Sequence, residues 1–282
     1  MMLQTKQIKL NRRVVFESVS TETPFHRVPK PFFENESCFM FVKKGGFNFR
    51  TPLKNIALTP ENALLAKCGN YYLEKSTSAH EEDSPLELFG VFFYPEMVKA
   101  FFPSELSLES FEVTDFDVTE IDPHPIFSTY VDSLAHLFEN PHLADDDLVR
   151  IKLKEIMLLL YKTGVFPSLG SFLKSLFHPF EYQFKEIIEA NILSDLTLEE
   201  LASMCHMSLS TFKRRFSEYF DVPPRTYLLQ KKLQTAKELV QMHDQPIAKI
   251  ALACGFTSTS GFIRAYNKAY GVSPSQERLN QK

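Results

Sequence analysis

The sequence predicts an α+β protein with a β-rich N-terminal part and an all-α C-terminal part. Three observations support this prediction. Residues 1–120 consist mainly of short apolar or alternating runs separated by turn residues, as in an antiparallel barrel or sandwich. Residues 121–165 instead carry apolar side chains at helical spacing. Residues 196–278 contain one helical pattern twice, which indicates a duplicated supersecondary unit.

The first 120 residues are rich in phenylalanine. The whole chain contains 27 Phe and no Trp. The simpler interpretation is that these rings fill the core of a small barrel. The alternative is that they line an apolar pocket for a fatty or aromatic effector. Turn residues such as Gly45 and Gly46 can close a tight hairpin between two of the runs.

Two helices are predicted within residues 121–165. Asp122 followed by Pro123 is expected to begin the first helix. The acidic run at 145–147 is expected to begin the second, because carboxylates suit a helix N-terminus, and Gly164 is expected to end it.

The second of these helices is apolar on more than one side. One seam has spacings of four, three and four residues and consists of Val149, Leu153, Ile156 and Leu160. Two arrangements are open: one face packs on the barrel while the other meets a partner, or both faces are buried in one subunit.

Residues 166–179 form the expected join between the two parts, because they contain two prolines and a glycine. The segment also carries large apolar side chains that would be costly to leave in water. We therefore predict a short, partly docked helix there. Residues 180–192 then form the first helix of a C-terminal domain that spans residues 180–282.

The duplicated pattern is a pair of short helices joined by a turn, with three aromatic residues spaced four apart on the second helix. The copies superimpose with an offset of 49 residues, which becomes 50 after one extra residue in the second turn. Equivalent positions include Leu198 and Ile247, Ala202 and Ala251, Cys205 and Cys254, Phe212 and Phe262, Phe216 and Tyr266, and Phe220 and Tyr270. Ser208 is a candidate N-cap, and Gly255 suits a turn with positive φ.

The second helix of each copy, expected over Ser208–Phe220 and Thr259–Tyr270, has a polar face of hydroxyl and basic side chains. Arg214 and Arg264 fall at equivalent positions in the two copies. An arginine can donate to guanine O6 and N7 together, and short hydroxyl side chains let a helix lie deep in the major groove. A solvated face would explain any single residue, but the repetition favours DNA reading.

From about Phe180 to Arg278 the chain resembles the DNA-binding domain of the AraC/XylS family of bacterial transcription regulators. The matching residues are the segments IAKIALACGF and GVSP together with Phe262, Tyr266 and Arg278, and YLLQKKLQTAKELV resembles the helix that joins the two units in that family. The departures are Lys232 in place of Arg, Asp221 in place of Gly, Gly261 in place of an aromatic residue, and Glu277 in place of Tyr or Phe. Asp tolerates the left-handed conformation, whereas Gly261 should loosen its helix by about 1 kcal/mol relative to Ala.

The resemblance implies that both recognition helices, held by the joining helix near Tyr227–Gln241, enter successive major-groove faces about 34 Å apart. It assigns base reading to Ser210, Lys213, Arg214, Thr259, Ser260 and Arg264. It assigns phosphate contacts, which set register without reading sequence, to Ser208, Arg215, Lys231, Lys268 and Ser275. Similar proteins dimerise through such helical hairpins, so a homodimer through the seam of Val149, Leu153, Ile156 and Leu160 is expected.

Residues 1–120 resemble, more weakly, the cupin-like barrel that precedes the DNA domain in many AraC-family proteins. Cupin metal sites need clustered histidines and a glutamate, whereas this part offers only His26 and His80, far apart in sequence. No nucleophile elbow or glycine-rich phosphate loop occurs in the sequence. We therefore expect no catalytic residues, no metal or other cofactor and no enzyme activity. The barrel is expected to bind an unknown small-molecule or protein effector.

Composition constrains the function less. The net charge of −4 alone argues against nucleic-acid binding, but residues 180–282 carry 13 Lys and Arg against 11 Asp and Glu. Four cysteines without paired metal spacing suit a reducing compartment. The N-terminus lacks a signal-peptide core, and no apolar run reaches membrane-spanning length. A cytoplasmic location is expected.

We predict a sequence-specific DNA-binding transcriptional regulator that is modulated by a ligand or partner at the N-terminal barrel. One alternative is a cupin-type metal enzyme with a regulatory tail, which stoichiometric bound metal would indicate. Another is a protein-interaction module with weak DNA binding, because Gly261 and the small positive excess of the C-terminal domain leave room for it.

Overall fold

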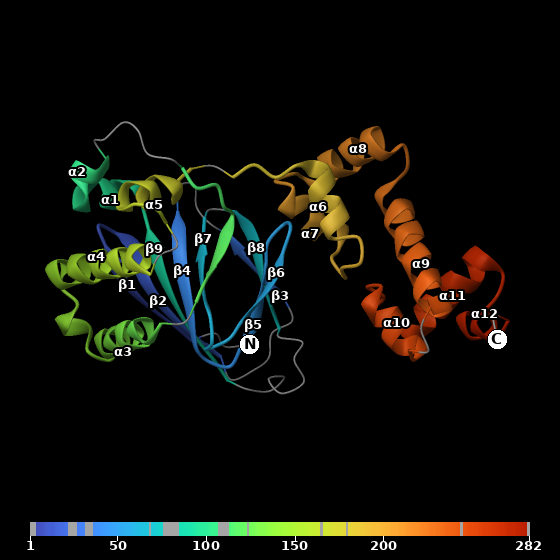
Figure 1. The fold of residues 1–282 in the computed structure, drawn as a ribbon, viewed down its shortest axis with the longest axis horizontal. Coiled ribbons are helices and arrows are strands. Elements are labelled where there is room, and N and C mark those ends of the chain that lie inside the picture. The colour runs from blue at the N-terminus through green and yellow to red at the C-terminus, as the bar shows by residue number, and fades with distance from the viewer. Residues whose placement is uncertain are drawn as a thin grey trace. The chain divides into compact units, whose positions relative to one another are not determined.

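The computed structural model of the chain describes residues 4–21, 27–31, 36–67, 69–75, 85–106, 113–122, 124–163, 166–178, 180–242 and 245–280. The chain divides into two units, Met1–Glu181 and Tyr182–Lys282 (Figure 1). The first unit combines sheets and helices, and the second is entirely helical in its described residues. The predicted α+β class is therefore confirmed.

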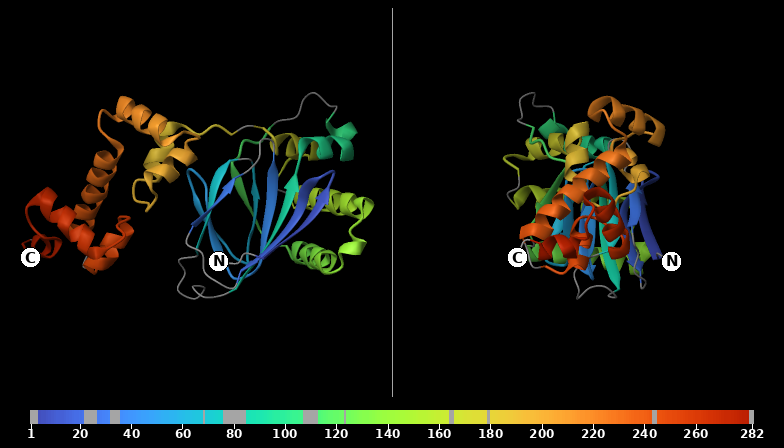
Figure 2. Two further views of the ribbon diagram at one scale, coloured as in Figure 1. Left: turned by 180° about the vertical axis from the view of Figure 1, so that it is seen from behind. Right: turned by 90° about the vertical axis from the view of Figure 1, so that its right-hand side faces the viewer.

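The first unit contains two antiparallel sheets, which Figures 1 and 2 show with the helices α3, α4 and α5 along one side. Among the described residues, the larger sheet has six strands in the order β1-β2-β9-β4-β7-β10, and the smaller has four in the order β3-β8-β5-β6. The strands are β1 (Gln4–Leu10), β2 (Arg13–Thr21), β3 (Arg27–Pro31), β4 (Ser37–Lys44), β5 (Phe47–Arg50), β6 (Asn55–Leu58), β7 (Ala63–Ala66), β8 (Asn70–Lys75), β9 (Leu86–Phe93) and β10 (Val118–Ile121).

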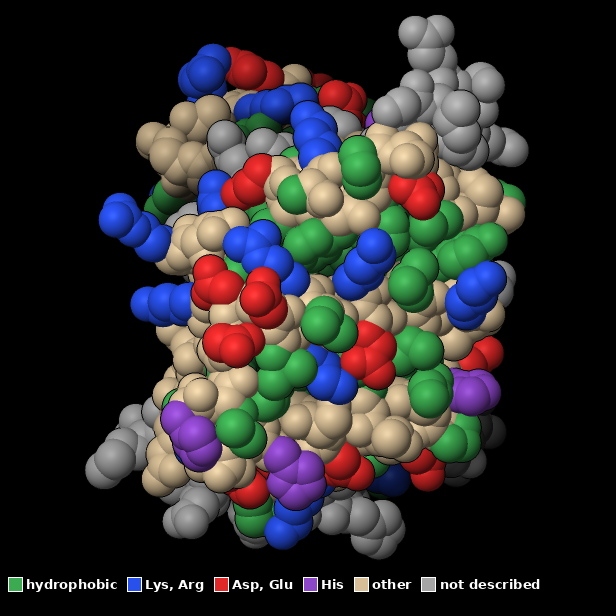
Figure 3. Space-filling model, turned by 90° about the vertical axis from the view of Figure 1, so that its left-hand side faces the viewer, with side chains coloured by type: hydrophobic (Ala, Val, Ile, Leu, Met, Phe, Trp, Pro, Cys, Tyr) green, Lys and Arg blue, Asp and Glu red, His purple; other side chains and the backbone are tan. Residues whose placement is uncertain are grey.

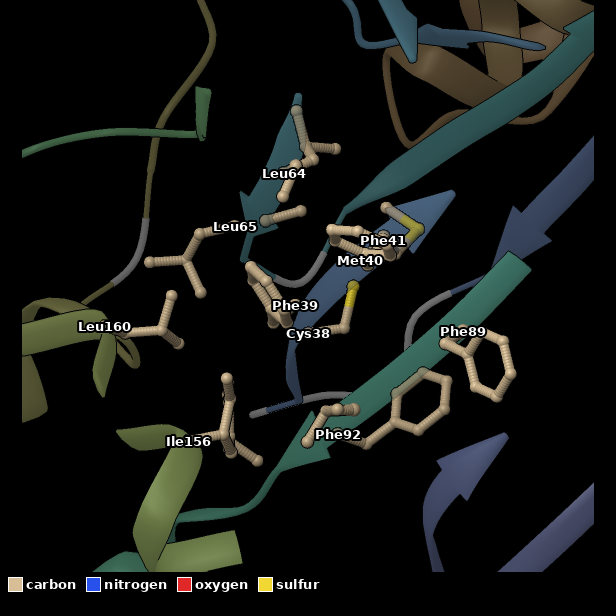
Figure 4. Close-up of a cluster of buried hydrophobic side chains, with 14 of the residues drawn as sticks. Cys38, Phe39, Met40, Phe41, Leu64, Leu65, Phe89, Phe92, Ile156 and Leu160 are labelled. Atoms are coloured by element: carbon tan, nitrogen blue, oxygen red, sulfur yellow. The ribbon is translucent and has the colours of Figure 1, made fainter. Parts of the chain in front are cut away.

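The core of the first unit is centred on β4, which pairs with β9 on one side and β7 on the other. The first six side chains of β4 are all buried, and residues of both sheets and of the helices share one hydrophobic cluster. Such continuous burial is expected of a strand that is covered on both faces. Figure 4 shows the helical side, where Ile156 and Leu160 point toward Phe39 and Leu65. Phenylalanine therefore fills this core, as the simpler interpretation of the composition predicts.

Among its described residues the first unit has six helical segments, and two of them lie where the sequence was expected to be β. They are α1 (Pro95–Phe101), α2 (Pro103–Leu106), α3 (Pro125–Glu139), η1 (Pro141–Leu143), α4 (Asp146–Lys162) and α5 (Leu169–Ser175). The prediction that residues 1–120 are mainly β did not include α1 and α2. Helix α1 begins directly after a strand with a proline in its first turn and buries Met97 and Val98.

The starts of the two long helices differ in how well the sequence predicts them. Helix α3 begins at Pro125, not at Asp122, because His124 is the N-cap and its Nδ1 accepts from the amide of Ile126 at 3.2 Å. Helix α4 begins in the acidic run as predicted, and the Asp145 carboxylate accepts from the amide of Leu148 at 2.8 Å. Pro123 and Gly164, two further predicted boundary residues, lie outside the described residues.

The apolar seam of α4 lies inside the protomer. Val149, Leu153, Ile156 and Leu160 are each at most 1% exposed and belong to the common core. In this structure these four side chains are not available to a second copy of the chain. The opposite side of α4 is open, and Ile151 there is 62% exposed. Figure 3 views the side of the molecule on which α3 and α4 lie, with hydrophobic side chains scattered among charged ones.

Helix α5 in the predicted join is docked on the first unit. Phe172 and Leu173 are buried in the common core. The backbone that follows is bonded to the sheets: the Ser37 hydroxyl donates to the carbonyl of Leu176, and the Lys67 ammonium donates to the carbonyl of His178 at 3.0 Å. The predicted short docked helix is therefore present.

The second unit consists of α6 (Phe184–Ala190), α7 (Leu198–Met204), α8 (Leu209–Phe220), α9 (Pro224–Met242), α10 (Ile247–Ala253), α11 (Thr259–Tyr270) and α12 (Pro274–Leu279). The short pairs α7–α8 and α10–α11 are the two predicted copies, and α9 joins them. Helix α6 is shorter than the predicted segment 180–192. None of the described helices of either unit has the length and hydropathy that crossing a bilayer requires.

Candidate nucleic-acid interface

The first helix-turn-helix is built by local caps. Thr197 and Glu200 form a capping box that begins α7. The turn then passes through His206, whose φ is +53°. The Ser208 hydroxyl accepts from the amide of Thr211 at 3.2 Å and caps α8, as predicted. Asp221 ends α8 in the left-handed conformation (φ 59°), where the sequence departs from the glycine usual in the family.

Aromatic packing determines which side of α8 faces solvent. Phe212 and Phe216 are fully buried, with ring centroids 5.7 Å apart. Phe184 of α6 meets both rings edge-on, at 5.8 Å and 6.2 Å. These contacts hold one side of α8 against the unit, so its polar side is turned outward.

The second helix-turn-helix repeats this construction. Gly255 lies in the turn with φ +68°, as its position in the sequence predicts. The Ser258 hydroxyl accepts from the amide of Gly261 at 3.2 Å and caps α11. Phe262 and Tyr266 are fully buried, with ring centroids 5.5 Å apart.

The candidate base-reading residues of α8 lie together on its outer face. Ser210, Lys213 and Arg214 are all exposed, and their spacings of three and four from Ser210 place them on one side of the helix. The Arg214 side chain is 70% exposed and lies 3.3 Å from the Glu218 carboxylate one turn later. An exposed pair of this kind is weak, so the guanidinium can exchange that partner for a base edge.

The candidate base-reading residues of α11 are similarly placed. Ser260 and Arg264 are exposed and one turn apart, and Thr259 is half-buried in the first turn. Arg264 thus occupies on α11 the position that Arg214 occupies on α8.

The candidate phosphate-contacting residues surround these faces. Ser208, Arg215, Lys268 and Ser275 are exposed, and Lys231 on α9 is half-buried. Two of the cations are supported by aromatic rings of the unit: Arg215 lies 5.1 Å from the ring centroid of Phe184, and Lys231 lies 5.7 Å from that of Tyr227.

Glu277 anchors α12 to the second helix-turn-helix. Its carboxylate accepts from the Tyr266 hydroxyl at 2.6 Å and from the Gln241 amide at 2.8 Å, and Lys237 lies 3.6 Å away. Burial raises the pKa of Glu277, but these hydrogen bonds and Lys237 outweigh burial and lower the pKa overall. The acidic departure from the family pattern therefore has a partner on both α9 and α11.

The cysteines of the second unit are structural. Cys205 and Cys254 are buried and free. Burial raises the pKa of the Cys205 thiol to about 12 and also raises that of Cys254. Both side chains are therefore neutral, as predicted for small residues on buried stripes.

A second candidate site, which sequence reasoning did not locate, is a cavity of about 180 Å³ between the two sheets of the first unit. Its walls are mainly apolar, and they include Val19, Val28, Met40, Leu73, Leu88 and Phe92. Lys30 and Glu17 line one end, 3.9 Å apart, and both also line a neighbouring, more polar cavity that contains Arg12 and Arg13. A cavity of this size can hold a ring or a short hydrocarbon chain.

Within the described part of the chain, no cluster of three or more His, Cys, Asp or Glu side chains is arranged to hold a metal ion. His26 and His80, the two histidines considered as cupin ligands, lie outside the described residues.

Comparison with known proteins accounts for both units. Residues 201–280 match the family described as helix-turn-helix domain, and residues 37–172 match the family described as ExsA N-terminal regulatory domain. Both matches agree with the resemblance to the AraC/XylS family that the sequence predicts. A solved transcriptional regulator with an AraC-type DNA-binding domain, from Chromobacterium violaceum, is 31% identical to this chain. The match covers 35% of this chain and 88% of that structure, with a TM-score of 0.31.

Two relatives of this chain are named as regulators. The virulence regulon transcriptional activator VirF of Yersinia enterocolitica is 30% identical over 162 residues, which cover 56% of this chain and 58% of VirF. The HTH-type transcriptional regulator ExsA of Pseudomonas aeruginosa is 27% identical over 154 residues, which cover 55% of each protein. The match thus spans little more than half the length of these relatives.

Proposed function

We propose that the protein is a sequence-specific DNA-binding transcriptional regulator and that α8 and α11 read two successive major-groove faces. The observation that carries the proposal is the repeated outer face, in which an exposed arginine follows a hydroxyl-capped helix start in both copies. Two such helices would have to lie about one DNA turn apart to read successive major-groove faces of one duplex. The names of VirF and ExsA support the same function.

Within this proposal the predicted residues keep separate roles. Base edges are read by Ser210, Lys213, Arg214, Thr259, Ser260 and Arg264. Phosphates are bound by Ser208, Arg215, Lys231, Lys268 and Ser275. A soluble regulator of this kind acts in the cytoplasm, and its function requires neither a cofactor nor catalysis.

The direct test is selection from a random duplex pool by the full chain at a stated salt concentration. We expect enrichment of one sequence containing two short conserved blocks about one helical turn apart. Enrichment of no sequence, or of a single block, would contradict the proposal. Metal analysis of the same preparation tests the rival enzyme, for which stoichiometric zinc, iron or manganese is required.

We further propose that the sheets of the first unit form a cupin-like barrel whose cavity binds an effector. The apolar walls, with Lys30 and Glu17 shared with the neighbouring cavity that Arg12, Arg13 and Glu36 line, suit a small molecule with a hydrocarbon or aromatic body and an anionic group. Isothermal titration with a panel of short-chain carboxylates tests this. Met40→Trp, which fills the cavity, should abolish any binding that Lys99→Ala, on the exposed surface of α1, leaves intact.

We also propose a homodimer through the outward face of α4. In an antiparallel helix pair related by a two-fold axis, residues i and j meet when their numbers have a constant sum. One such axis pairs Ile151 with Leu158 of a second copy and Asp147 with Lys162 of a second copy. Asp147 and Lys162 are exposed, so this register pairs apolar residues on either side of the axis and opposite charges at both ends, with the exposed Lys154 of each copy next to the axis. The buried seam packs α4 against the core of its own protomer, which fixes the orientation of the outward face.

A further inference from the structure

The connector helix α9 carries a lysine between the two helix-turn-helix units. Toward its N-terminus, Tyr227 packs on the first helix-turn-helix, with ring centroids 5.5 Å from Phe216 and 4.5 Å from Phe220. Toward its C-terminus, Leu233, Ala236 and Val240 belong to the core of the second helix-turn-helix. Lys232 therefore lies at the point where α9 passes from the first helix-turn-helix to the second.

The Lys232 ammonium binds one backbone carbonyl from each side. It donates to the carbonyl of Ser194 at 2.5 Å and to that of Gly255 at 2.9 Å. Ser194 lies in the loop that leads into α7, and Gly255 lies in the turn between α10 and α11. A single side chain, here called the Lys232 bridge, thus connects the entry of the first helix-turn-helix with the turn of the second.

The two backbones are unusually close at this bridge. A Cβ atom placed on Gly255 would lie 2.3 Å from the carbonyl oxygen of Leu193, 2.7 Å from that of Ser194 and 2.8 Å from the Lys232 ammonium. Position 255 therefore requires glycine for two reasons: the backbone at Leu193 and Ser194 comes too close for a Cβ atom, and φ is +68°. Because Lys232 adjoins the part of α9 that packs in the second helix-turn-helix, a shift of that helix-turn-helix relative to the first would break the hydrogen bond to Ser194.

The partly buried surroundings of the Lys232 ammonium strengthen its two hydrogen bonds. Burial lowers the pKa of Lys232, an effect that Asp195 and Cys254 oppose. A charged donor in such a poorly hydrated place forms strong hydrogen bonds, and the carbonyls would lose a partner if it were removed.

We propose that Lys232 is a positioning residue that sets the spacing at which α8 and α11 engage DNA; this inference rests on the proposed DNA-binding function. Each helix-turn-helix keeps its own aromatic core, so each should still read its own block when the bridge is lost. What changes is the range of orientations between them. One extra base pair between the blocks turns the second block by about 35° and moves it by about 3.4 Å. Two helix-turn-helix motifs held at a fixed spacing by the Lys232 bridge should tolerate this change poorly.

The bridge itself is tested by pulsed electron–electron distance measurement on the full chain without DNA. Nitroxide labels on p-acetylphenylalanine replace Ser217 and Asn267, which are exposed and equivalent on α8 and α11. Lys232→Met keeps the aliphatic stem and should broaden the distance distribution. Lys232→Arg, which retains several donors, should keep it narrow, and the exposed control Gln234→Met should match the wild type.

A Lys232→Met distribution as narrow as that of the wild type overturns the proposal. If that variant does not fold, as judged by circular dichroism, Lys232→Gln is used instead. The shorter glutamine side chain cannot reach both carbonyls, so the label-to-label distance distribution should broaden in this variant too. A distribution as narrow as that of the wild type would again overturn the proposal.

The consequence for DNA is tested on the duplex selected from the random pool, with one base pair inserted or deleted between its blocks. Wild-type affinity should fall about tenfold or more, which is the cost of losing one or two base contacts. Lys232→Met should show less than about a threefold fall and unchanged affinity for each block alone. An equally steep fall in the variant overturns the spacing role. If the wild type selects no duplex, the DNA-binding function and the spacing role both fail, while the distance widths still decide whether the bridge exists.

Discussion

Arg214 and Arg264 illustrate how a repeated residue gains meaning that a single one lacks. Each is an exposed arginine on a helix face, where solvation is the ordinary explanation. Their equivalence rests on the buried aromatic residues that orient both helices, such as Phe216 and Tyr266. Because the same orientation recurs, the two guanidinium groups extend from corresponding places on the two helices.

At the level of single contacts, Arg214→Ala should weaken binding to the selected duplex by about 1–3 kcal/mol and relax the preference at one base pair. The reason is the loss of a bidentate contact to guanine. The matched variant is Lys268→Ala, which should weaken binding to all sequences alike and reduce the slope of affinity against salt. Binding assays across a set of single-base variants would separate the two. Base preferences unchanged in Arg214→Ala would remove Arg214 from the reading set.

Glu277→Gln tests the anchoring of α12. The carboxylate has a lowered pKa in the folded protein, so its contribution to stability is complete above the ordinary glutamate pKa of 4.5 and is lost as the pH falls below that value. At pH 7 the substitution should reduce hydrogen-exchange protection of α12 by about tenfold, since a charge-assisted hydrogen bond contributes about 1.5–3 kcal/mol. The difference from wild type should shrink below pH 4.5. A difference that grows on acidification would contradict the pKa assignment.

At the level of elements, α4 shows that an apolar seam does not by itself identify an interface. Val149, Leu153, Ile156 and Leu160 form the more regular stripe, yet the structure uses it for the protomer core. The outward stripe of α4 is interrupted by charged residues. Only the burial seen in the structure shows which stripe packs in the core and which is exposed.

Charge exchange on α4 tests the proposed dimer. Asp147→Lys should weaken self-association about tenfold in sedimentation experiments, because it places two lysines together at each end of the interface. Lys162→Asp should do the same, and the double variant should restore association. Asp146→Lys changes charge in the same helical turn but off the outward stripe, so it should have little effect. Failure of the double variant to recover would exclude this register.

The sequence predicts the helical repeat better than the first unit for a physical reason. Helix periods, caps such as Ser208 and turns such as Gly255 are local, so they can be read from a few neighbouring residues. Strand β1, with its irregular pairing to β2, and strand β3 have no strong local signal. Helix α3 starts later than Asp122 because the side chain of His124 supplies the cap. These differences depend on pairing partners and side-chain positions that composition does not reveal.

The cavity and the Lys232 bridge could not be predicted from the sequence. Both arise where segments distant in the chain approach each other: β3 with β9 around the cavity, and the loop at Ser194 with Gly255 at the bridge. The substitution of lysine for the usual family arginine is visible in the sequence. The two carbonyls that it joins are not.

At the scale of the whole molecule, the proposed functions divide between the two units. Effector binding and self-association are proposed for the first unit, and base reading is proposed for the second. Each of these functions has its own variants above, so a failure in one leaves the others measurable.

The most direct test of the central claim is hydroxyl-radical and methylation-interference footprinting of the full chain on its selected duplex. Two protected segments should appear on the same side of the duplex, with guanine N7 interference in two adjacent major-groove faces about 10 base pairs apart. Arg214→Ala should remove interference from one face, and Arg264→Ala from the other. A single protected segment, or loss of the same contacts in both variants, would contradict the claim that α8 and α11 read one duplex together.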